Sequence, residues 1–365
     1  MVRSTRCGKS HWSRVAVALV FGTLLWNSWV SPIARADDAP GTRRESAEPL
    51  KPGDHVREVL APAPELASTE NDGKPKGEAG PAAPAPTRRR IYRLHVPPKF
   101  DPNQPTTVVF VLHPFGVDAG LWILYCGFNA KADEGNFLAV YPGGLGLIPS
   151  WNAGGIKGYV VDDVGYIREV LADLHRVAKV DTKRIYATGM SNGGMMSYRL
   201  AAEMSDTFAA IAAVGGTLCL APEKIQLKSP VSVLHIHGTK DNIVPYNGLG
   251  NAPRIMSYDS VDGSIQPFVK ANGCPDSFTV TPLPDKVDDG TTTTVIRYPP
   301  GRDGAVVELY KVEGGGHTWP GRAFPGSGRE DPEKARPNGA RLGRTAQDFR
   351  ANDVIWEFFQ KHPKP

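Results

Sequence analysis

A serine with a glycine two positions away on each side constrains the fold of this chain most strongly. The segment Gly189-Met190-Ser191-Asn192-Gly193 follows the β-rich run 184–188 and precedes a helix-compatible stretch that continues to residue 204. A turn this tight between a strand and a helix needs small neighbours, and it presents the serine hydroxyl at the edge of a sheet. The spacing alone is a weak signal, but its place between a strand and a helix predicts that Ser191 is a nucleophile.

Strand-like and helix-like segments alternate through residues 90–363, which is typical of a mostly parallel sheet with helices on both faces. Short β-rich runs are found at 91–96, 107–112, 137–141, 184–188, 231–237 and 305–312. Apolar residues at helical spacing predict a helix that begins at Asp162 or Asp163, one of which caps it, and a last helix over about 345–360. We therefore expect one α/β catalytic domain.

The first 36 residues have the pattern of a secretory signal peptide. A basic stretch precedes a short apolar run, 15–26, and Ala34-Arg35-Ala36 matches a signal cleavage site. That run is too short to cross a bilayer, which takes about 20 apolar residues. Residues 37–89 are rich in Pro, Ala and charged residues and poor in aromatic ones, so we expect a disordered linker before the domain over 90–363. The protein is therefore predicted to be secreted, to the extracellular or periplasmic space.

Cleavage of the signal would change the charge balance of the chain. Residues 1–36 hold five of the 42 Lys and Arg residues and none of the 38 Asp and Glu residues, so 37 basic and 38 acidic side chains remain. A chain this close to neutrality has no broad electrostatic surface for nucleic acid or for an anionic membrane. We expect neither nucleic-acid binding nor stable membrane insertion after cleavage.

A serine hydroxyl is a weak nucleophile near neutral pH, so it needs a histidine base and an acid that orients the histidine. In folds of this kind the acid and then the histidine follow the serine along the chain. Asp241 comes just after one predicted strand, and His317 lies in a Gly-rich loop after another. These positions predict a catalytic triad of Ser191, Asp241 and His317.

The negative charge that develops on an acyl substrate needs two backbone N–H groups, the oxyanion hole. One donor is expected from Asn192, directly after the nucleophile. The other should come from the loop His113-Pro114-Phe115-Gly116. Because proline has no N–H, Phe115 is the better candidate.

Together these motifs resemble the polyhydroxybutyrate depolymerase and feruloyl esterase family of secreted α/β-hydrolases. The resemblance covers about residues 90–361 and is carried by Gly189-Met190-Ser191-Asn192-Gly193-Gly194-Met195-Met196, Leu234-His235-Ile236-His237-Gly238 with Asp241, Asp162-Asp163-Val164-Gly165, and His317-Thr318-Trp319-Pro320-Gly321. It implies an α/β-hydrolase fold without a large lid domain, the triad given above, and no metal or organic cofactor. It also implies a serine esterase that works through an acyl-enzyme.

The substrate class that the resemblance implies is an extracellular polyester such as poly(3-hydroxybutyrate), or a feruloyl or acetyl ester on plant polysaccharide. Two departures concern the substrate side. His113-Pro114 stands where such proteins usually have His-Gly, and Gly155-Ile156 stand where they often carry cysteines.

Two other functions remain open at this stage. A serine peptidase on the same scaffold would use the same three residues, although no propeller or cap domain is evident. A non-catalytic binding module of this fold would not require all three side chains, so their joint presence argues against it.

Several polar and aromatic residues have both a structural and a functional interpretation. Trp151 and Trp319 flank the motif loops, where they would either stack on substrate or pack the loops onto the core. His113, His235 and His237 lack a carboxylate or cysteine at metal-ligand spacing, so we expect them to be structural and expect no metal site.

We interpret Asp206, which also follows the serine, as a turn residue, and Asp162 and Asp163 as helix caps. Cys126, Cys219 and Cys274 remain after signal cleavage. Of the possible disulfides, we favour Cys219–Cys274, because both lie in loop-like contexts.

Overall fold

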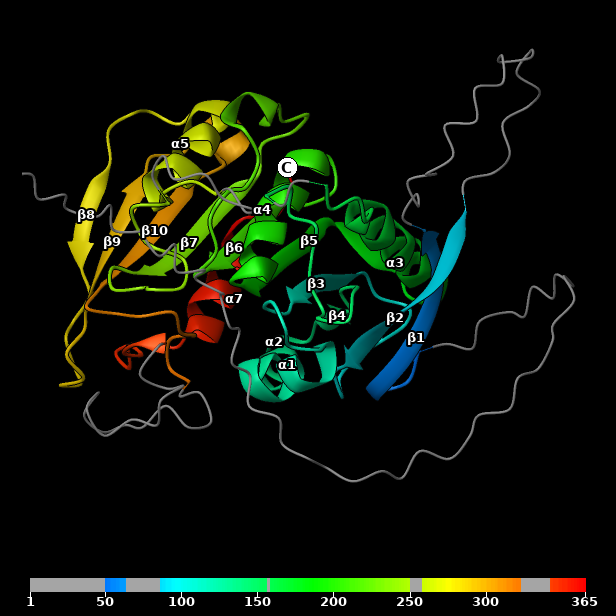
Figure 1. Ribbon diagram of the computed structural model, residues 1–365. Coiled ribbons are helices and arrows are strands. Elements are labelled where there is room, and N and C mark those ends of the chain that lie inside the picture. The colour runs from blue at the N-terminus through cyan, green and yellow to red at the C-terminus, as the bar shows by residue number, and fades with distance from the viewer. Residues whose placement is uncertain (1–49, 64–85, 156–157, 250–257, 323–341) are drawn as a thin grey trace, which may run out of the picture. The chain divides into compact units, whose positions relative to one another are not determined.

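The computed structural model describes residues 50–63, 86–155, 158–249, 258–322 and 342–365, and within them ten strands form one sheet (Figure 1). In chain order the strands are β1 (Gly53–Pro62), β2 (Thr87–Val96), β3 (Thr106–Leu112), β4 (Leu138–Pro142), β5 (Val180–Met190), β6 (Ala210–Val214), β7 (Ser232–Gly238), β8 (Thr279–Pro282), β9 (Thr292–Tyr298) and β10 (Val307–Glu313). Their order across the sheet is β1-β2-β4-β3-β5-β6-β7-β10-β9-β8.

The six central strands, from β4 to β10 in that order, run parallel, while β1 and β2 on one side and β9 and β8 on the other pair antiparallel. Parallel neighbours bring their carboxyl ends to the same edge of the sheet, where the loops that follow β3, β5, β6, β7 and β10 meet. This is the α/β-hydrolase fold, and it confirms the predicted fold class.

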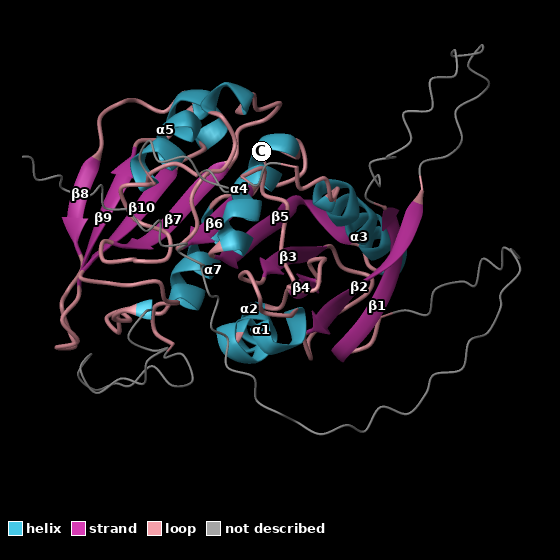
Figure 2. Ribbon diagram, in the orientation of Figure 1, coloured by secondary structure: helices cyan, strands magenta, loops and turns pink. Residues whose placement is uncertain are grey.

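Helices cover both faces of the sheet (Figure 2). One face packs against α3 (Asp163–Val177), α4 (Asn192–Glu203) and α5 (Val261–Asn272), and the other against α1 (Ala119–Cys126), α2 (Phe128–Gly135) and α7 (Ala351–Lys361). Strand β3 shows why: Phe110 and Leu112 join the first core, whereas Val109 and Val111 join the second. Side chains of a strand alternate between its faces, so a fully apolar strand needs two cores.

The structure corrects the predicted linker over 37–89, because part of it belongs to the sheet. Strand β1 pairs along its length with β2, from Gly53 opposite Val96 to Pro62 opposite Thr87. Val59 and Ala61 of β1 are buried, whereas Leu60 between them and the charged Asp54 and Glu58 are exposed. A strand that is half polar has the average composition of a linker, and only its alternation of buried and exposed residues reveals it. Residues 37–49 and 64–85 lie outside the described residues.

The other predicted strands and helices are confirmed with shifts of a few residues. Strand β5 begins at Val180, four residues before the predicted run, and α7 begins at Ala351 rather than near residue 345. Strands β1, β6, β8 and β9 do not correspond to any predicted run. Strand β6 is an alanine-rich run that follows α4 closely, and such a short apolar run does not distinguish a strand from a helix.

The favoured Cys219–Cys274 disulfide is wrong. All three described cysteines are free. The thiol of Cys219 lies 3.7 Å from the carbonyl oxygen of Thr217, and that of Cys274 lies 3.5 Å from the carbonyl oxygen of Ala305. Each thiol is therefore directed to its own backbone acceptor.

The predicted signal peptide, residues 1–36, lies outside the described residues. Within the described ranges, none of the helices combines the length and the apolar character that a membrane crossing requires.

An ion pair fastens β1 to α3. Oδ2 of Asp173 accepts hydrogen bonds from Arg57 Nε at 2.7 Å and from the Tyr92 hydroxyl at 2.6 Å, and Oδ1 accepts one from Arg176 at 2.8 Å. Burial alone would raise the pKa of Asp173, but these hydrogen bonds outweigh burial and hold the pKa below its usual value.

We expect Asp173→Asn to lower the free energy of unfolding by about 1–3 kcal/mol at neutral pH, because Arg57 loses its charged partner. Folding lowers the pKa of Asp173, so its contribution is present above the unfolded-state pKa of about 4 and is lost as the pH falls through the folded-state pKa. Urea unfolding should therefore show the difference from the unsubstituted protein shrinking below about pH 4. As a control, Asp206→Asn disrupts an exposed pair with Lys228 and should cost less than about 1 kcal/mol. Equal losses in both variants would contradict a fastening role for Asp173.

Candidate active site

Ser191 occupies a strained turn between β5 and α4. Its φ of 55° and ψ of −122° lie in a region that non-glycine residues rarely adopt. The Ser191 N–H donates to the carbonyl oxygen of Val214 at 2.8 Å, which ties the turn to the end of β6. A Cβ at Gly189 would stand 2.6 Å from the carbonyl carbon of Gly193. The glycines on either side are therefore required by close backbone contact, as the sequence motif predicts.

Asp241 and His317 contact each other directly. Oδ2 of Asp241, in the loop after β7, accepts a hydrogen bond from His317 Nδ1 at 2.7 Å. Oδ1 accepts the backbone N–H groups of Ile243 at 2.8 Å and Val244 at 2.7 Å, which fixes the rotation of the carboxylate. Burial would raise the pKa of Asp241, but His317 and a second histidine, His237, outweigh it and hold the pKa far below its usual range. The carboxylate is therefore charged and holds the proton of His317 on Nδ1.

The loop after β6 connects Ser191 with the Asp241–His317 pair. A Cβ added to Gly215 would lie 3.2 Å from His317 Nδ1 and 3.6 Å from Asp241 Oδ2, and one added to Gly216 would collide with the carbonyl oxygen of Ser191. The three predicted triad residues thus surround two consecutive glycines. Asp206, the alternative acid, pairs instead with Lys228 at 2.7 Å on the surface.

The oxyanion loop after β3 is a tight turn. The Val117 N–H donates to the Pro114 carbonyl at 3.3 Å, and Gly116 has a φ of 78°, as in a type II turn. The Gly116 N–H is occupied by the carbonyl of Pro149 at 2.9 Å. The Phe115 N–H has no acceptor in the described part of the chain. The N–H of Asn192, in the first turn of α4, has no acceptor within its own helix.

Of the two interpretations of Trp151, the structure supports the one in which it packs the loops onto the core. Its side chain is fully buried, and its Nε1–H donates to the carbonyl of His113 at 3.0 Å. Its backbone N–H donates to Oδ1 of Asn192 at 2.7 Å, and its carbonyl accepts from Nδ2 of Asn192 at 3.1 Å. Trp151 therefore joins the oxyanion loop to the first turn of α4.

Trp319 likewise packs its loop onto the core. It is fully buried, donates from Nε1 to Oδ1 of Asn352 at 2.7 Å, and stands edge-on to Trp122. It holds the loop of His317 against α7 and α1, and no surface of its ring remains for a substrate.

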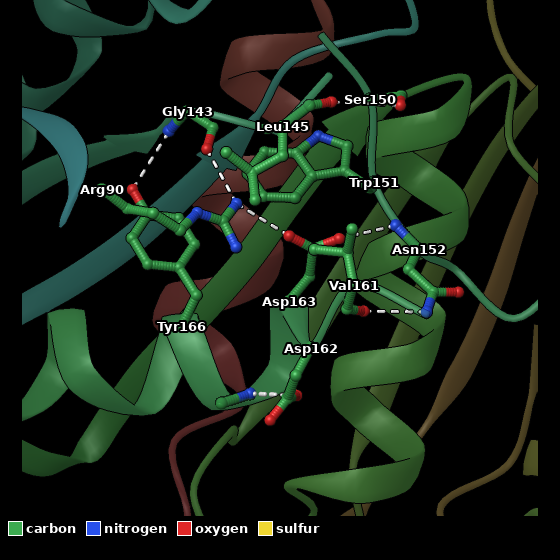
Figure 3. A network of polar contacts seen from close by, with 12 residues as sticks. Arg90, Gly143, Leu145, Ser150, Trp151, Asn152, Val161, Asp162, Asp163 and Tyr166 are labelled. Atoms are coloured by element: carbon green, nitrogen blue, oxygen red, sulfur yellow. Dashed lines mark hydrogen bonds and ion pairs between the residues drawn. The ribbon is translucent and has the colours of Figure 1, made fainter. Parts of the chain in front are cut away.

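A buried ion pair supports the segment around Trp151 (Figure 3). Arg90 of β2 and Asp163 of α3 approach to 2.7 Å with side chains that are 1% and 0% exposed. The guanidinium lies over the Tyr166 ring at 3.5 Å and donates to the Gly143 carbonyl at 2.9 Å, while Oδ2 of Asp163 accepts the Asn152 N–H at 2.7 Å. The pair thus fixes the residue next to Trp151.

The capping prediction for this helix is half right. Asp162 is the N-cap of α3 and accepts the Gly165 N–H at 2.7 Å. Asp163 instead pairs with Arg90, a partner more than 70 positions earlier in the chain. No local pattern in the sequence predicts that pairing. Charged side chains are seldom fully buried unless they are paired, so the burial of both residues marks the pair as structurally important.

The three histidines interpreted as structural make hydrogen bonds within the protein. His113 accepts the Gly144 N–H on Nε2 at 2.8 Å, and burial lowers its pKa to about 4. His235 and His237 bond to each other at 3.0 Å. No cluster of three His, Cys, Asp or Glu side chains suited to a metal ion occurs among the described residues. One contact was not predicted from the sequence: Nε2 of His237, interpreted as structural, lies 3.3 Å from Oδ2 of the predicted triad acid Asp241.

Known proteins share much of this sequence. The profile of the Phospholipase/Carboxylesterase family matches residues 163–257. "Putative esterase NocK" of Nocardia uniformis subsp. tsuyamanensis is 33% identical over 253 residues, which cover 65% of this chain and 73% of that protein.

Two longer relatives match over part of their length. The bifunctional acetylxylan esterase/xylanase XynS20E of Neocallimastix patriciarum is 26% identical over 63% of this chain, and feruloyl esterase B of Piromyces equi is 30% identical over 52% of it. The matched regions span only 31% and 35% of those two proteins.

We expect Asp163→Asn to lower the free energy of unfolding by about 3–5 kcal/mol, because the buried Arg90 would lose its charged partner. The matched control is Glu58→Gln, which breaks the exposed pair with Arg89, the neighbour of Arg90 in β2. That change should cost less than about 1 kcal/mol. Denaturant unfolding of the two variants measures both, and similar small losses would show that the buried pair is dispensable.

Proposed function

This chain belongs to the α/β-hydrolase family of the esterases named above, and on that premise we propose that it hydrolyses carboxylic esters through an acyl-enzyme on Ser191. The contact between His317 and Asp241, beside the strained turn of Ser191, carries this proposal. A charged carboxylate on Nδ1 leaves Nε2 of His317 as the basic nitrogen, which is the nitrogen that a serine nucleophile requires.

The reaction has two halves. In the first, Oγ of Ser191 attacks the ester carbonyl carbon while Nε2 of His317 takes the hydroxyl proton, and the tetrahedral intermediate then expels the alcohol, which receives that proton. In the second, His317 takes a proton from water, the resulting hydroxide attacks the acyl-enzyme, and Ser191 regains its proton as the acid leaves. Asp241 stays charged throughout and stabilises the imidazolium.

The oxyanion is assigned to the N–H groups of Asn192 and Phe115. Three observations support this assignment. Asn192 opens α4, where the helix dipole favours negative charge, and both N–H groups lack an acceptor among the described residues. Gly116, the next N–H in the loop, is already bonded to Pro149. Trp151 connects the two donors through His113 and the Asn192 side chain, so it would keep their separation fixed.

We assign the substrate to two ester classes, an extracellular polyester such as poly(3-hydroxybutyrate), or feruloyl or acetyl esters on plant polysaccharide. The names of two relatives support the second class. Release of soluble product from polyester film, feruloylated xylan and acetylated xylan distinguishes these substrates.

Export across a membrane is part of this proposal, and it rests on the signal pattern of residues 1–36. Polymeric substrates of this kind cannot enter a cell. The N-terminal sequence of the protein recovered from culture medium or periplasm tests it, with Asp37 as the expected first residue.

Ser191→Ala is expected to lower kcat for a p-nitrophenyl ester by about 10⁴-fold or more and to abolish labelling by a fluorophosphonate, with the fold intact.

Asp241→Asn should also cripple turnover while slow labelling of Ser191 persists, because the His317 tautomer is no longer fixed. If the unsubstituted protein folds but is neither labelled nor active, a binding module is favoured. If the unsubstituted protein cleaves a peptide panel in preference to esters, a peptidase is favoured.

Phe115→Pro should lower kcat by about 10²–10³-fold with little change in KM, because it removes one N–H from the oxyanion hole. Position 115 precedes the glycine of a type II turn, a position that proline readily takes, so the variant should fold. The matched control, Phe115→Ala, loses the ring but keeps the N–H, and it should retain most of kcat. Equal kcat values for the two variants would place the second donor elsewhere.

A further inference from the structure

A chain of buried side chains connects the nucleophile helix to the triad acid. The Tyr198 hydroxyl of α4 lies 2.6 Å from His235 Nδ1, and His235 Nε2 lies 3.0 Å from His237 Nδ1. His237 Nε2 then lies 2.9 Å from the Val244 carbonyl and 3.3 Å from Asp241 Oδ2. The two imidazole rings are parallel within 4°, and all these side chains are buried.

The proton positions along this chain follow from its two ends. The Val244 carbonyl and the Asp241 carboxylate can only accept, so His237 carries its proton on Nε2 and presents Nδ1 as an acceptor. His235 must then donate from Nε2, which leaves its Nδ1 to accept from the Tyr198 hydroxyl. Burial, and secondarily the neighbouring His237, lowers the pKa of His235 well below its usual value, which keeps that ring neutral. Every donor in the chain then has an acceptor.

Oδ2 of Asp241 faces two histidines. It accepts the hydrogen bond of His317 Nδ1 at 2.7 Å and lies 3.3 Å from His237 Nε2, whose N–H bonds to the Val244 carbonyl, whereas Oδ1 is held by backbone N–H groups. An N–H dipole beside a charged carboxylate stabilises its negative charge, and inside a protein this effect is poorly screened. Removing the His237 N–H would therefore leave more of that charge to act on His317 and make His317 more basic.

Other ionisable groups near the chain come from the neighbouring loop and strand. Tyr246, from the loop after β7, stands edge-on to His237, and Lys311 of β10 lies over the Tyr246 ring at 5.8 Å. Lys311 also pairs with Glu313 at 2.5 Å. The side chains with the largest effect on the Asp241 carboxylate are His317 and His237.

We propose that His237 is a positioning residue for the ester hydrolysis: it holds a neutral N–H beside the Asp241 oxygen that His317 uses, and its tautomer is held from two sides, by Val244 and, through His235, by Tyr198. This inference rests on the proposed function, since it assigns His317 as the base. It gives α4 a second role, because the helix that begins beside the nucleophile also sets the hydrogen bonding of the acid.

Two substitutions at position 237 separate this role from simple packing. His237→Gln places an N–H near Nε2 and so keeps the donor to Asp241, whereas His237→Asn keeps an acceptor near Nδ1 and loses that donor. The acidic limb of the pH profile of kcat/KM reports the free base, and its position does not depend on how much active protein is present. We expect the limb to stay in place in the Gln variant and to move by about 0.5–1 pH unit to higher pH in the Asn variant.

Tyr198→Phe tests the far end of the chain with the loss of a single oxygen atom. Without the hydroxyl, the tautomer of His237 is held only by Val244 and Asp241, so the alternative tautomer, with its proton on Nδ1, costs less free energy. We expect the acidic limb to move in the same direction as in His237→Asn, and kcat to fall by about threefold to tenfold with KM unchanged. In the His237→Gln background the same change should leave the limb in place, because glutamine has no tautomer to set.

The control is Tyr186→Phe, which removes a buried hydroxyl that has no hydrogen-bond partner in the described part of the chain. Its pH profile should match that of the unsubstituted protein. Labelling of Ser191 by a fluorophosphonate in every variant separates the two proposals. An unsubstituted protein without labelling or ester turnover would overturn the proposed function itself. Labelled, active variants whose acidic limb stays in place in both Tyr198→Phe and His237→Asn, or moves equally in the Gln and Asn variants, would overturn the role of His237 alone.

Discussion

The buried pair of Arg90 and Asp163 is the constraint on which the substrate side of the site depends. Two charges removed from water are costly unless each finds its partner and further hydrogen bonds, so the pair tolerates only one arrangement of its surroundings. It holds Asn152, which positions Trp151, and Trp151 in turn joins the oxyanion loop to α4. The geometry of the candidate site therefore depends on Arg90 of β2, a strand that contributes no residue to the predicted triad.

A second set of contacts acts on the acid side of the site, and helix α4 takes part in both. The Asn192 side chain at its start bonds to Trp151, and the Tyr198 hydroxyl two turns later bonds to His235. A rigid helix therefore connects the donors that would hold the oxyanion with the histidines beside Asp241. Because the two sets share this helix, a disturbance of either one reaches the turn of Ser191 through the same element.

Local patterns in the sequence predicted five of the six central strands, the turn at Ser191 and the loop position of Asp241, because each depends on neighbours within a few residues. They failed where the partner is distant. Strand β1 has the composition of a linker, and only pairing with β2 makes it a strand. The sequence left Trp151 open between substrate contact and packing and favoured a helix cap for Asp163, since nothing near them in the chain reveals His113 or Arg90. The disulfide failed for the same reason, because a loop context does not bring two thiols together.

The turn of Ser191 also bears on what kind of selection formed this protein. A side chain at a φ of 55° costs about 1–3 kcal/mol relative to relaxed backbone, and glycine would escape most of that cost. Folding alone would therefore favour glycine at position 191. A protein that serves only as a binding surface gains nothing from the strain, whereas a hydrolase needs the hydroxyl and must find the lost stability elsewhere. Conformational cost at this one residue is thus a physical sign of chemistry, independent of any likeness to other proteins.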